Sequence, residues 1–240
     1  MAEQREIITT FSEMAPRYES LMNSELNRFW GVDYESFVKI LLAGVSIDED
    51  ERILDIATGT AFIPSFLLDN NKHLTGKNIF GLDLTFGMLV HGKERLIERA
   101  YDPRPPLLCA SAHAMPFVGQ IFDQAICCLA THHMNADTLL ANIYFSLKPE
   151  GVLHIADAGA ASGWKNILIK GLIKAVAFIY FLATENYSRA LAESAAIGNV
   201  HTIKEWTDLI QNHGFKDLSL EKLKSKRFWT PDPLIIKAKK

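Results

Sequence analysis

The chain of 240 residues carries a formal net charge of −3, with 48% hydrophobic and 22% charged residues. A chain of this kind can bury one sizeable core, so we expect a single globular domain over residues 1–240. The slightly negative charge argues against a dedicated nucleic-acid-binding protein, although lysine and arginine gather near the C-terminus.

The N-terminal residues 1–45 have a helical pattern and no apolar stretch of the kind that begins a signal peptide. Three cysteines, Cys109, Cys127 and Cys128, lie in apolar runs without the spacing of a disulfide framework or a zinc site. We therefore expect buried thiols in a reducing compartment, a cytoplasmic location and no bound metal.

From residue 52 onward, short apolar runs alternate with longer amphipathic stretches, which is typical of a parallel sheet with helices on both faces. The predicted strands are 52–57, 78–83, 106–110, 122–129, 151–157, 216–223 and 233–238. The predicted helices are 61–71, 85–100, 136–146 and 202–213, the last with a capping box at Thr202 and Glu205. The expected fold is an α/β, Rossmann-like three-layer sandwich, whose seven-stranded, mostly parallel sheet has an antiparallel edge strand.

Residues 158–200 form a helical insert after the fifth predicted strand. Ligands of open α/β sheets bind beyond the carboxyl ends of the strands, so this insert and residues 1–45 are placed to cover that site. Within the insert, residues 167–183 are strongly apolar but span only about 25 Å as a helix, less than a bilayer requires. We favour a core or substrate-covering helix, with membrane-surface contact and a dimer interface as alternatives.

The first predicted strand ends in an acid followed by small residues, ILDIATGTA over residues 53–61. Small residues between a strand and a helix let backbone N–H groups approach a ligand closely. A dinucleotide fingerprint laid on Gly59 would place Phe62 where close packing needs glycine, which counts against a nicotinamide cofactor. Small residues at every second position, Ala57, Gly59 and Ala61, fit a different cofactor pattern.

A second acid, Asp83, ends the next predicted strand. A carboxylate at this place can accept both hydroxyl hydrogens of an adenosine ribose. The alternative is that Asp83 caps the following helix, a position that Thr85 can equally fill. We favour ribose binding.

Five motifs occur in the order and approximate spacing of the class I S-adenosylmethionine-dependent methyltransferases: LDIATGTAF, GLDLTFGML, SAHAMPF, IFDQAICCLATHH and LKPEGVLHIAD. Within that superfamily the chain most resembles the ubiquinone/menaquinone-biosynthesis C-methyltransferase group and its relatives in small-molecule metabolism. The segment FSEMAPRYESLMN near the N-terminus resembles the opening segment of that group. The resemblance covers residues 8–157 well and residues 200–240 loosely, and it implies S-adenosylmethionine as the cofactor.

The resemblance also implies a role for each matching position. The methionine end of the cofactor would be held by Asp55, Ala57, Gly59 and Thr60, and its ribose by Asp83. The remaining contacts would come from Leu84 and Met88 beside the adenine, Ser111 and Ala112 at its amino group, Leu129 and Ala130 below the sulfonium, and Tyr18 as a cover. Ala61 and Ser111 depart from the family pattern, which usually has glycine and aspartate there.

The implied activity is methyl transfer to carbon or oxygen of a small, largely apolar or aromatic metabolite by in-line displacement. The protein then mainly positions the acceptor and excludes water, so no metal or nucleophile motif is required. The insert carries aromatic residues that fit either a core or an apolar acceptor pocket: Trp164, Phe178, Tyr180, Phe181 and Tyr187. The alternative function is a cofactor-binding protein of the same fold that no longer methylates, either a cyclase-like catalyst or a scaffold.

An acceptor that is a phenol, an enol or an acidic carbon would need a base near the sulfonium. The candidates are Asp157, at the end of the fifth predicted strand, His132 and His133 after the fourth, and His201 before the last helix. We expect the adjacent histidines to point to different sides, so that they do not serve one site, and their spacing does not indicate a metal site. For each histidine a structural role is the favoured alternative.

Overall fold

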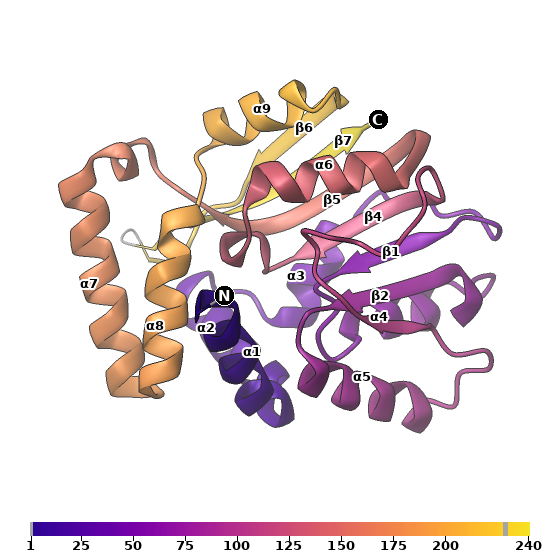
Figure 1. Cartoon of the computed structure of the whole chain (residues 1–240), viewed down its shortest axis with the longest axis horizontal. Coiled ribbons are helices and arrows are strands. Elements are labelled where there is room, and N and C mark those ends of the chain that lie inside the picture. The colour runs from indigo at the N-terminus through magenta and orange to yellow at the C-terminus, as the bar shows by residue number, and fades with distance from the viewer. Residues whose placement is uncertain (1, 228–229) are drawn as a thin grey trace.

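The computed structural model describes residues 2–227 and 230–240. Within these residues seven strands form one sheet in the order β3-β2-β1-β4-β5-β7-β6 (Figure 1). The strands are Ile53–Ile56 (β1), Ile79–Asp83 (β2), Leu107–Cys109 (β3), Phe122–Cys128 (β4), Leu147–Gly159 (β5), Lys216–Lys222 (β6) and Asp232–Lys239 (β7). Strands β1 to β5 pair in parallel, whereas β7 runs antiparallel to both β5 and the edge strand β6. The predicted Rossmann-like fold, with antiparallel pairing at the sheet edge, is confirmed.

The helices follow the predicted order. They are Ala2–Met14 (α1), Tyr18–Phe29 (α2), Tyr34–Leu41 (α3), Phe62–Asn70 (α4), Phe86–Glu98 (α5), Ala136–Ser146 (α6), Ile167–Thr184 (α7), Tyr187–Ala196 (α8) and Ile203–Asn212 (α9). Several begin at a polar residue whose side chain accepts a hydrogen bond from the first turn, as Asn135 does for α6 and Asn186 for α8. The capping box predicted at Thr202 and Glu205 is present at the start of α9.

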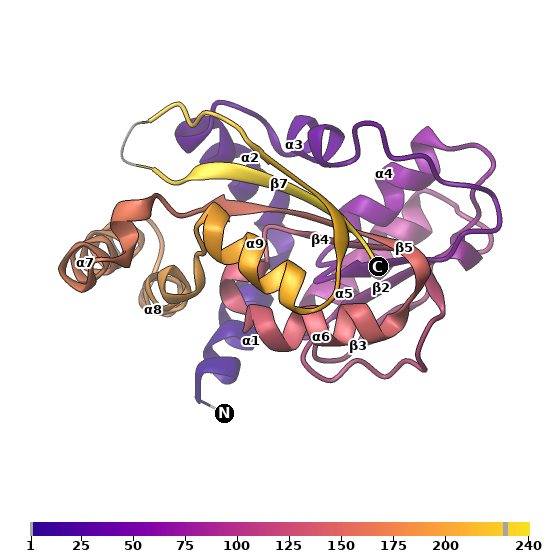
Figure 2. The same ribbon diagram turned by 90° about the horizontal axis from the view of Figure 1, so that it is seen from above.

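The sheet separates two hydrophobic cores, which makes the fold a three-layer sandwich (Figure 2). On one face α6 and α9 bury residues such as Leu139 and Trp206, and on the other α3 and α4 bury residues such as Phe37 and Leu67. Strand β1 supplies Leu54 to the first core and Ile53 to the second. Because both faces are covered, its sequence is a continuous apolar run apart from the acid.

The N-terminal helices and the insert come together beyond the carboxyl ends of the strands. Helices α7 and α8 form a pair at one end of the molecule, with α1 beside α8 (Figures 1 and 2). The Arg17 guanidinium donates to Glu185 at 2.8 Å, and Arg28 donates to the Tyr180 hydroxyl at 2.6 Å, so polar contacts join the two segments. Both predicted covering segments therefore meet over the same edge of the sheet.

Two expectations from the sequence are wrong in part, and for residues 167–183 the part that fails is the core helix, not the substrate-covering one. Helix α7 buries none of its residues in a core, and Ile167 and Leu172 are 83% and 66% exposed. Cys109 is exposed, because β3 is an edge strand, whereas Cys127 and Cys128 are buried as expected. Among the described residues α7 is also the one helix with the length and composition needed to cross a membrane, a property that a single apolar helix can have without spanning one.

Candidate functional site

The turn after β1 has an unusual backbone. Ala57, Gly59 and Ala61 all have positive φ angles, of 57°, 53° and 55°. Left-handed backbone costs an L-residue about 1 kcal/mol or more, and such strain is concentrated at ligand sites. Gly92 of α5 lies so close that a Cβ there would be 3.2 Å from the Ala61 Cβ. The missing side chain at Gly92 leaves room for Ala61 where the family pattern has glycine.

Asp83 connects this turn to the next one. Its Oδ2 accepts a hydrogen bond from the Gly59 N–H at 2.9 Å, and its Oδ1 accepts from the Thr85 N–H at 2.7 Å. Burial raises the pKa of this carboxyl, while the two N–H donors act in the opposite direction. Thr85 is the N-cap residue of α5 but its side chain makes no capping hydrogen bond, so Asp83, which accepts from the Thr85 N–H, also supports the start of this helix. Each carboxylate oxygen keeps a lone pair for a ligand hydroxyl.

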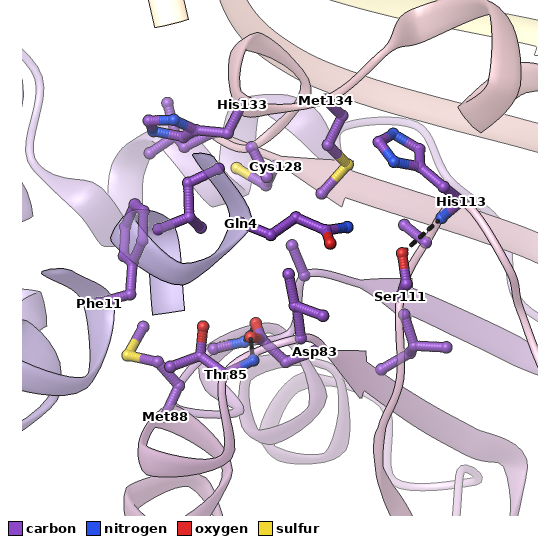
Figure 3. A pocket seen from close by; sticks show the side chains of 18 of the residues that line it. Gln4, Phe11, Asp83, Thr85, Met88, Ser111, His113, Cys128, His133 and Met134 are labelled. Carbon is purple, nitrogen blue, oxygen red and sulfur yellow. Dashed lines mark hydrogen bonds between the residues drawn. The ribbon is translucent and has the colours of Figure 1, made fainter. Parts of the chain in front are cut away.

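A first cavity opens at this edge of the sheet between the strands and α1 (Figure 3). Of the positions assigned to the cofactor, it is lined by Tyr18, Ala57, Gly59, Asp83, Leu84, Met88, Ser111, Ala112, Leu129 and Ala130. The strands bring these residues together because the carboxyl ends of β1, β2 and β4 lie at one edge.

Two assigned residues do not line the first cavity. Thr60 does not face the first cavity. Its hydroxyl instead donates to Glu19 at 2.9 Å. Asp55 lies beneath the turn and is fully buried.

Asp55 is nonetheless unusual electrostatically. Burial raises the pKa of its carboxyl to about 7, and the Asp83 carboxylate adds to the shift. Its Oδ2 has no hydrogen-bond partner among the described residues. A buried carboxylate without a partner favours a positively charged ligand nearby, so the residues present fit a cofactor with a sulfonium and an ammonium group.

Several residues that line the first cavity were not identified from the sequence. They are Gln4, Ile7, Phe11, Thr85, His113, Cys128, Met134 and, from the candidate bases, His133. In Figure 3, Gln4 extends from α1 into the space between Cys128 and Asp83. The helical pattern of residues 1–45 predicts a cover, but it carries no signal for which of its side chains reach the sheet.

A second cavity lies on the other side of Leu129. It encloses about 1350 Å³ including its mouth, compared with about 780 Å³ for the first cavity. Helices α2, α7 and α8 provide most of its lining, including Phe29, Tyr180 and Phe181, and the segments next to them add Trp30 and Trp164. The two cavities share Phe11, Tyr18, Leu129 and His133. Leu129 has a φ of 54°, so the strained backbone at this shared wall resembles that of the β1 turn.

His132 and Asp157 form a buried pair in the second cavity. The His132 Nδ1 lies 2.6 Å from Asp157 Oδ1, and Thr131 donates its hydroxyl to Asp157 Oδ2 at 2.6 Å. Burial lowers the pKa of His132, but the Asp157 carboxylate outweighs it and raises this pKa above its ordinary value. Burial would raise the pKa of Asp157, but His132 and the other hydrogen-bond donors lower it to about 2. Asp157 is thus an orienting acceptor for His132 and a poor base.

The expectation that the adjacent histidines point to different sides is wrong. Residues Thr131–His133 form a short 3-10 helix, and the rings of His132 and His133 lie 4.3 Å apart between centroids. Burial and the neighbouring His132 lower the pKa of His133 to about 4, so this imidazole is neutral at pH 7. His201 lies elsewhere, against the Trp206 ring, and lines neither cavity.

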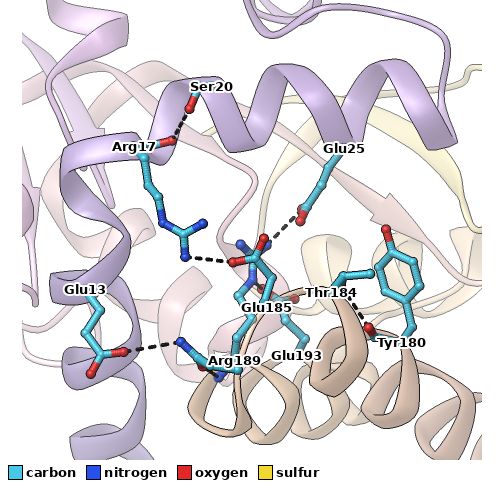
Figure 4. Close-up of polar contacts among 10 residues, drawn as sticks. Glu13, Arg17, Ser20, Glu25, Tyr180, Thr184, Glu185, Arg189 and Glu193 are labelled. Atoms are coloured by element: carbon cyan, nitrogen blue, oxygen red, sulfur yellow. Dashed lines mark hydrogen bonds and ion pairs between the residues drawn. The ribbon is translucent and has the colours of Figure 1, made fainter.

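The second cavity is also lined by a largely buried charge cluster that the sequence did not predict (Figure 4). Arg189, which is 2% exposed, donates to Glu25 of α2 at 2.8 Å and to Glu193 of its own helix at 3.2 Å. Burial raises the pKa of Glu25 to about 7, against the attraction of Arg189. Because Glu25 and Arg189 are 164 residues apart, only the fold brings them together.

Comparison with known proteins agrees with this geometry. Residues 54–155 match the family model described as a methyltransferase domain. The ubiquinone/menaquinone biosynthesis C-methyltransferase UbiE of Xylella fastidiosa is 27% identical over 153 residues, which are 63% of this chain and 57% of that protein. The match thus spans less than two thirds of that relative.

Solved structures share the fold at low sequence identity. The [4+2]-cyclase SpnF has a TM-score of 0.70 at 14% identity, and the alignment covers 98% of this chain and 94% of SpnF. Geranyl diphosphate C-methyltransferase from Streptomyces coelicolor, solved with Mg²⁺, geranyl diphosphate and S-adenosylhomocysteine, has a TM-score of 0.67 at 12% identity, covering 92% of this chain and 83% of that one. Residues 54–155 therefore match the methyltransferase domain family, and the chain as a whole has the Rossmann-like fold of its solved methyltransferase neighbours.

Proposed function

We propose that this protein transfers the methyl group of S-adenosylmethionine to carbon or oxygen of a small, largely apolar or aromatic metabolite. When bound, the cofactor supplies an electrophilic methyl group on its sulfonium. The observation that carries the proposal is the pair of cavities that share Leu129 and His133, one ending at Asp83 and the other lined by aromatic residues. Two ligands in these cavities would meet at the shared wall.

The residues of the chain have separate tasks in this proposal. Asp83 would bind the ribose hydroxyls, and the turn at Ala57 and Gly59 would approach the methionine end of the cofactor. Phe11 and Tyr18 would cover the junction and exclude water, which strengthens polar contacts inside. The His132–Asp157 pair faces the second cavity, where it can bind or deprotonate an acceptor oxygen.

Incubating the full chain with cofactor labelled in its methyl group and an organic extract of the source cells tests the proposal. We expect the label in a small, organic-soluble product, and no labelled product with Asp83→Ala. Labelled protein or RNA would contradict the proposal. Cofactor that binds but is not consumed would favour the alternative of a cyclase-like catalyst, for which the likeness of fold to SpnF provides a specific reason.

We further propose that the outer face of α7 lies on a membrane surface, from which a lipid-soluble acceptor enters the second cavity. Leu168, Leu172 and Ile179 are all more than half exposed on this helix. The Lys170 ammonium donates to the Gly198 carbonyl at 2.7 Å. Its positive charge therefore lies away from the outer face of α7. The opposite side of α7, with Ile173 and Tyr180, lines the second cavity. The same helix therefore carries both the exposed apolar surface and part of the proposed acceptor cavity.

We propose a cytoplasmic location for this protein, so that without membrane contact it would stay in the supernatant. Sedimentation with phosphatidylcholine vesicles tests the placement of α7 on a membrane surface. We expect the wild-type chain to pellet with the vesicles at moderate salt. A chain that stays in solution but forms dimers at the same concentration would show that a second copy covers α7 instead.

A further inference from the structure

The lining of the second cavity contains a group of three ligand atoms, of which the proposed methyl transfer uses only the one from His132. One ring nitrogen each of His132 and His133 and one carboxylate oxygen of Glu193 lie within 4.8 Å of one another. His132 and His133 come from the 3-10 helix after β4, and Glu193 comes from α8 of the insert. We propose that these three side chains bind a divalent transition-metal cation of the zinc type.

The donor set fits such a cation. Two imidazoles and one carboxylate are a set that zinc takes in sites with an open position, with bonds of about 2.0–2.2 Å. Tetrahedral ligand atoms at these bond lengths lie about 3.3 Å apart. Closing the group from 4.8 Å requires movements of about 1.5 Å at the ends of the side chains. Such movements are within the reach of rotations about side-chain bonds.

The neighbouring residues already orient the ligands. Asp157 holds the Nδ1 of His132 at 2.6 Å, which leaves Nε2 available to a ligand, and a carboxylate on the far nitrogen is the usual support of a metal-binding imidazole. Arg189 donates its Nε–H to one oxygen of Glu193 at 3.2 Å. The His133 ring packs against Phe11 and His132, and its nitrogens have no hydrogen-bond partner in residues 2–227 and 230–240.

The local charge balance also favours a cation. The carboxylates of Asp157 and Glu193 face the second cavity together with Glu25, whose pKa of about 7 leaves it partly ionised, whereas Arg189 contributes a single fixed positive charge. An added divalent cation would offset this excess in a region of low dielectric constant. An anion bound here would instead meet Glu25 and Glu193.

A cation at this place would have an open coordination position toward the acceptor, because His132, His133 and Glu193 all line the second cavity. It could bind an acceptor oxygen and lower the pKa of its hydroxyl, so that the proton leaves to solvent. Nε2 of His132 would then hold the cation and would not act as a base. This catalytic role depends on the proposed function, whereas binding of the cation does not.

The test uses tag-free, full-length protein that has been stripped with a chelator. We expect one equivalent of Co²⁺ to produce visible d–d absorption, and Zn²⁺ to displace it with one-to-one stoichiometry. Glu193→Gln and His133→Gln should each weaken Zn²⁺ binding at least tenfold. Asp157→Asn should weaken it about 10–100-fold through His132. Glu185→Gln and His201→Gln, which change the same residue types outside the group, should bind as the wild type does.

Absence of stoichiometric binding would overturn the proposal, and so would wild-type affinity in both Glu193→Gln and His133→Gln. Circular dichroism and binding of S-adenosylmethionine verify that each variant is folded. If the chain binds the cofactor but not the metal, only the metal site fails. If it binds the metal but neither binds nor consumes the cofactor, only the proposed function fails.

Discussion

The cavity around Asp83 and the cavity around Arg189 share a wall but are built from different parts of the chain. The first is formed mainly by the carboxyl ends of parallel strands and the turns that follow them. The second is formed mainly by α2, α7 and α8, which come from two segments that are distant in the sequence. The strands determine one cavity through their order in the sheet, whereas the other depends on contacts between two helical segments.

This difference suggests a division of labour. A cavity at strand ends is rigid, because both faces of the sheet are packed, and it suits a cofactor that is the same in every cycle. A cavity between helices held by a few ion pairs can change in size, which suits an acceptor that must enter and leave. The following predictions examine whether the two cavities are separable.

Loss of Arg189 should have the largest effect and should be confined to the helical cavity. In Arg189→Met the carboxylates of Glu25 and Glu193 lose their buried partner, and we expect a loss of about 3–5 kcal/mol in the free energy of unfolding. Arg17→Met, which removes a half-exposed ion pair between the same segments, should cost less than about 1 kcal/mol. Urea titration measures both, and unchanged stability of Arg189→Met would show that the cluster does not hold the segments.

Loss of Asp83 should affect only the cavity at the strand ends. Asp83→Ala removes the acceptor for the ribose hydroxyls, and we expect affinity for S-adenosylmethionine to fall at least about 100-fold, or roughly 3 kcal/mol. Asp208→Ala on the surface of α9 is the matched control. Isothermal titration calorimetry provides the measurement. Unchanged cofactor binding in Asp83→Ala would remove the ribose assignment.

Charge on the outer face of α7 should weaken membrane binding without changing the cofactor site. Leu172→Glu and Ile179→Glu replace exposed apolar side chains, and we expect each to reduce partitioning to vesicles by about tenfold or more. Phe145→Glu, at a 59% exposed position on α6, is the control for a general loss of surface hydrophobicity. Equal partitioning of all three variants would contradict docking through α7.

The pH dependence of cofactor binding should be the smallest effect. The fold raises the pKa of Asp55 to about 7, so the folded, cofactor-free protein binds this proton more tightly than the unfolded chain does. The stability that results is present at low pH and is lost as pH rises toward 7. A cationic cofactor should favour the ionised form, so affinity should increase by up to about tenfold per unit between pH 6 and 7.

Asp55→Asn separates the two consequences. We expect this variant to bind the cofactor without that pH dependence, and to be about 1–3 kcal/mol more stable than the wild type at pH 8 when no cofactor is present. Thermal unfolding at pH 5.5 and pH 8 measures the difference. A wild-type pH profile in the variant would show that another group titrates.

The sequence by itself determined the strands, the helices between them and most of the assigned cofactor residues around Asp83. These depend on patterns within a few residues: apolar runs for buried strands, small residues at the turn, and an acid at the end of a strand. Once parallel strands pair, their carboxyl ends lie at one edge, so Ala57, Asp83 and Leu129 meet for a reason that the sequence contains.

Only the tertiary structure decided the rest. The orientation of Thr60 toward Glu19 depends on a contact between the turn after β1 and α2. The meeting of His132, His133 and Glu193 depends on how α8 packs against the 3-10 helix Thr131–His133. The exposure of α7 could not be predicted from its apolar sequence, because a buried core helix and a membrane-contacting helix can have the same composition. Residues distant in sequence meet only when the whole chain has folded, and no local pattern encodes which side chains will touch.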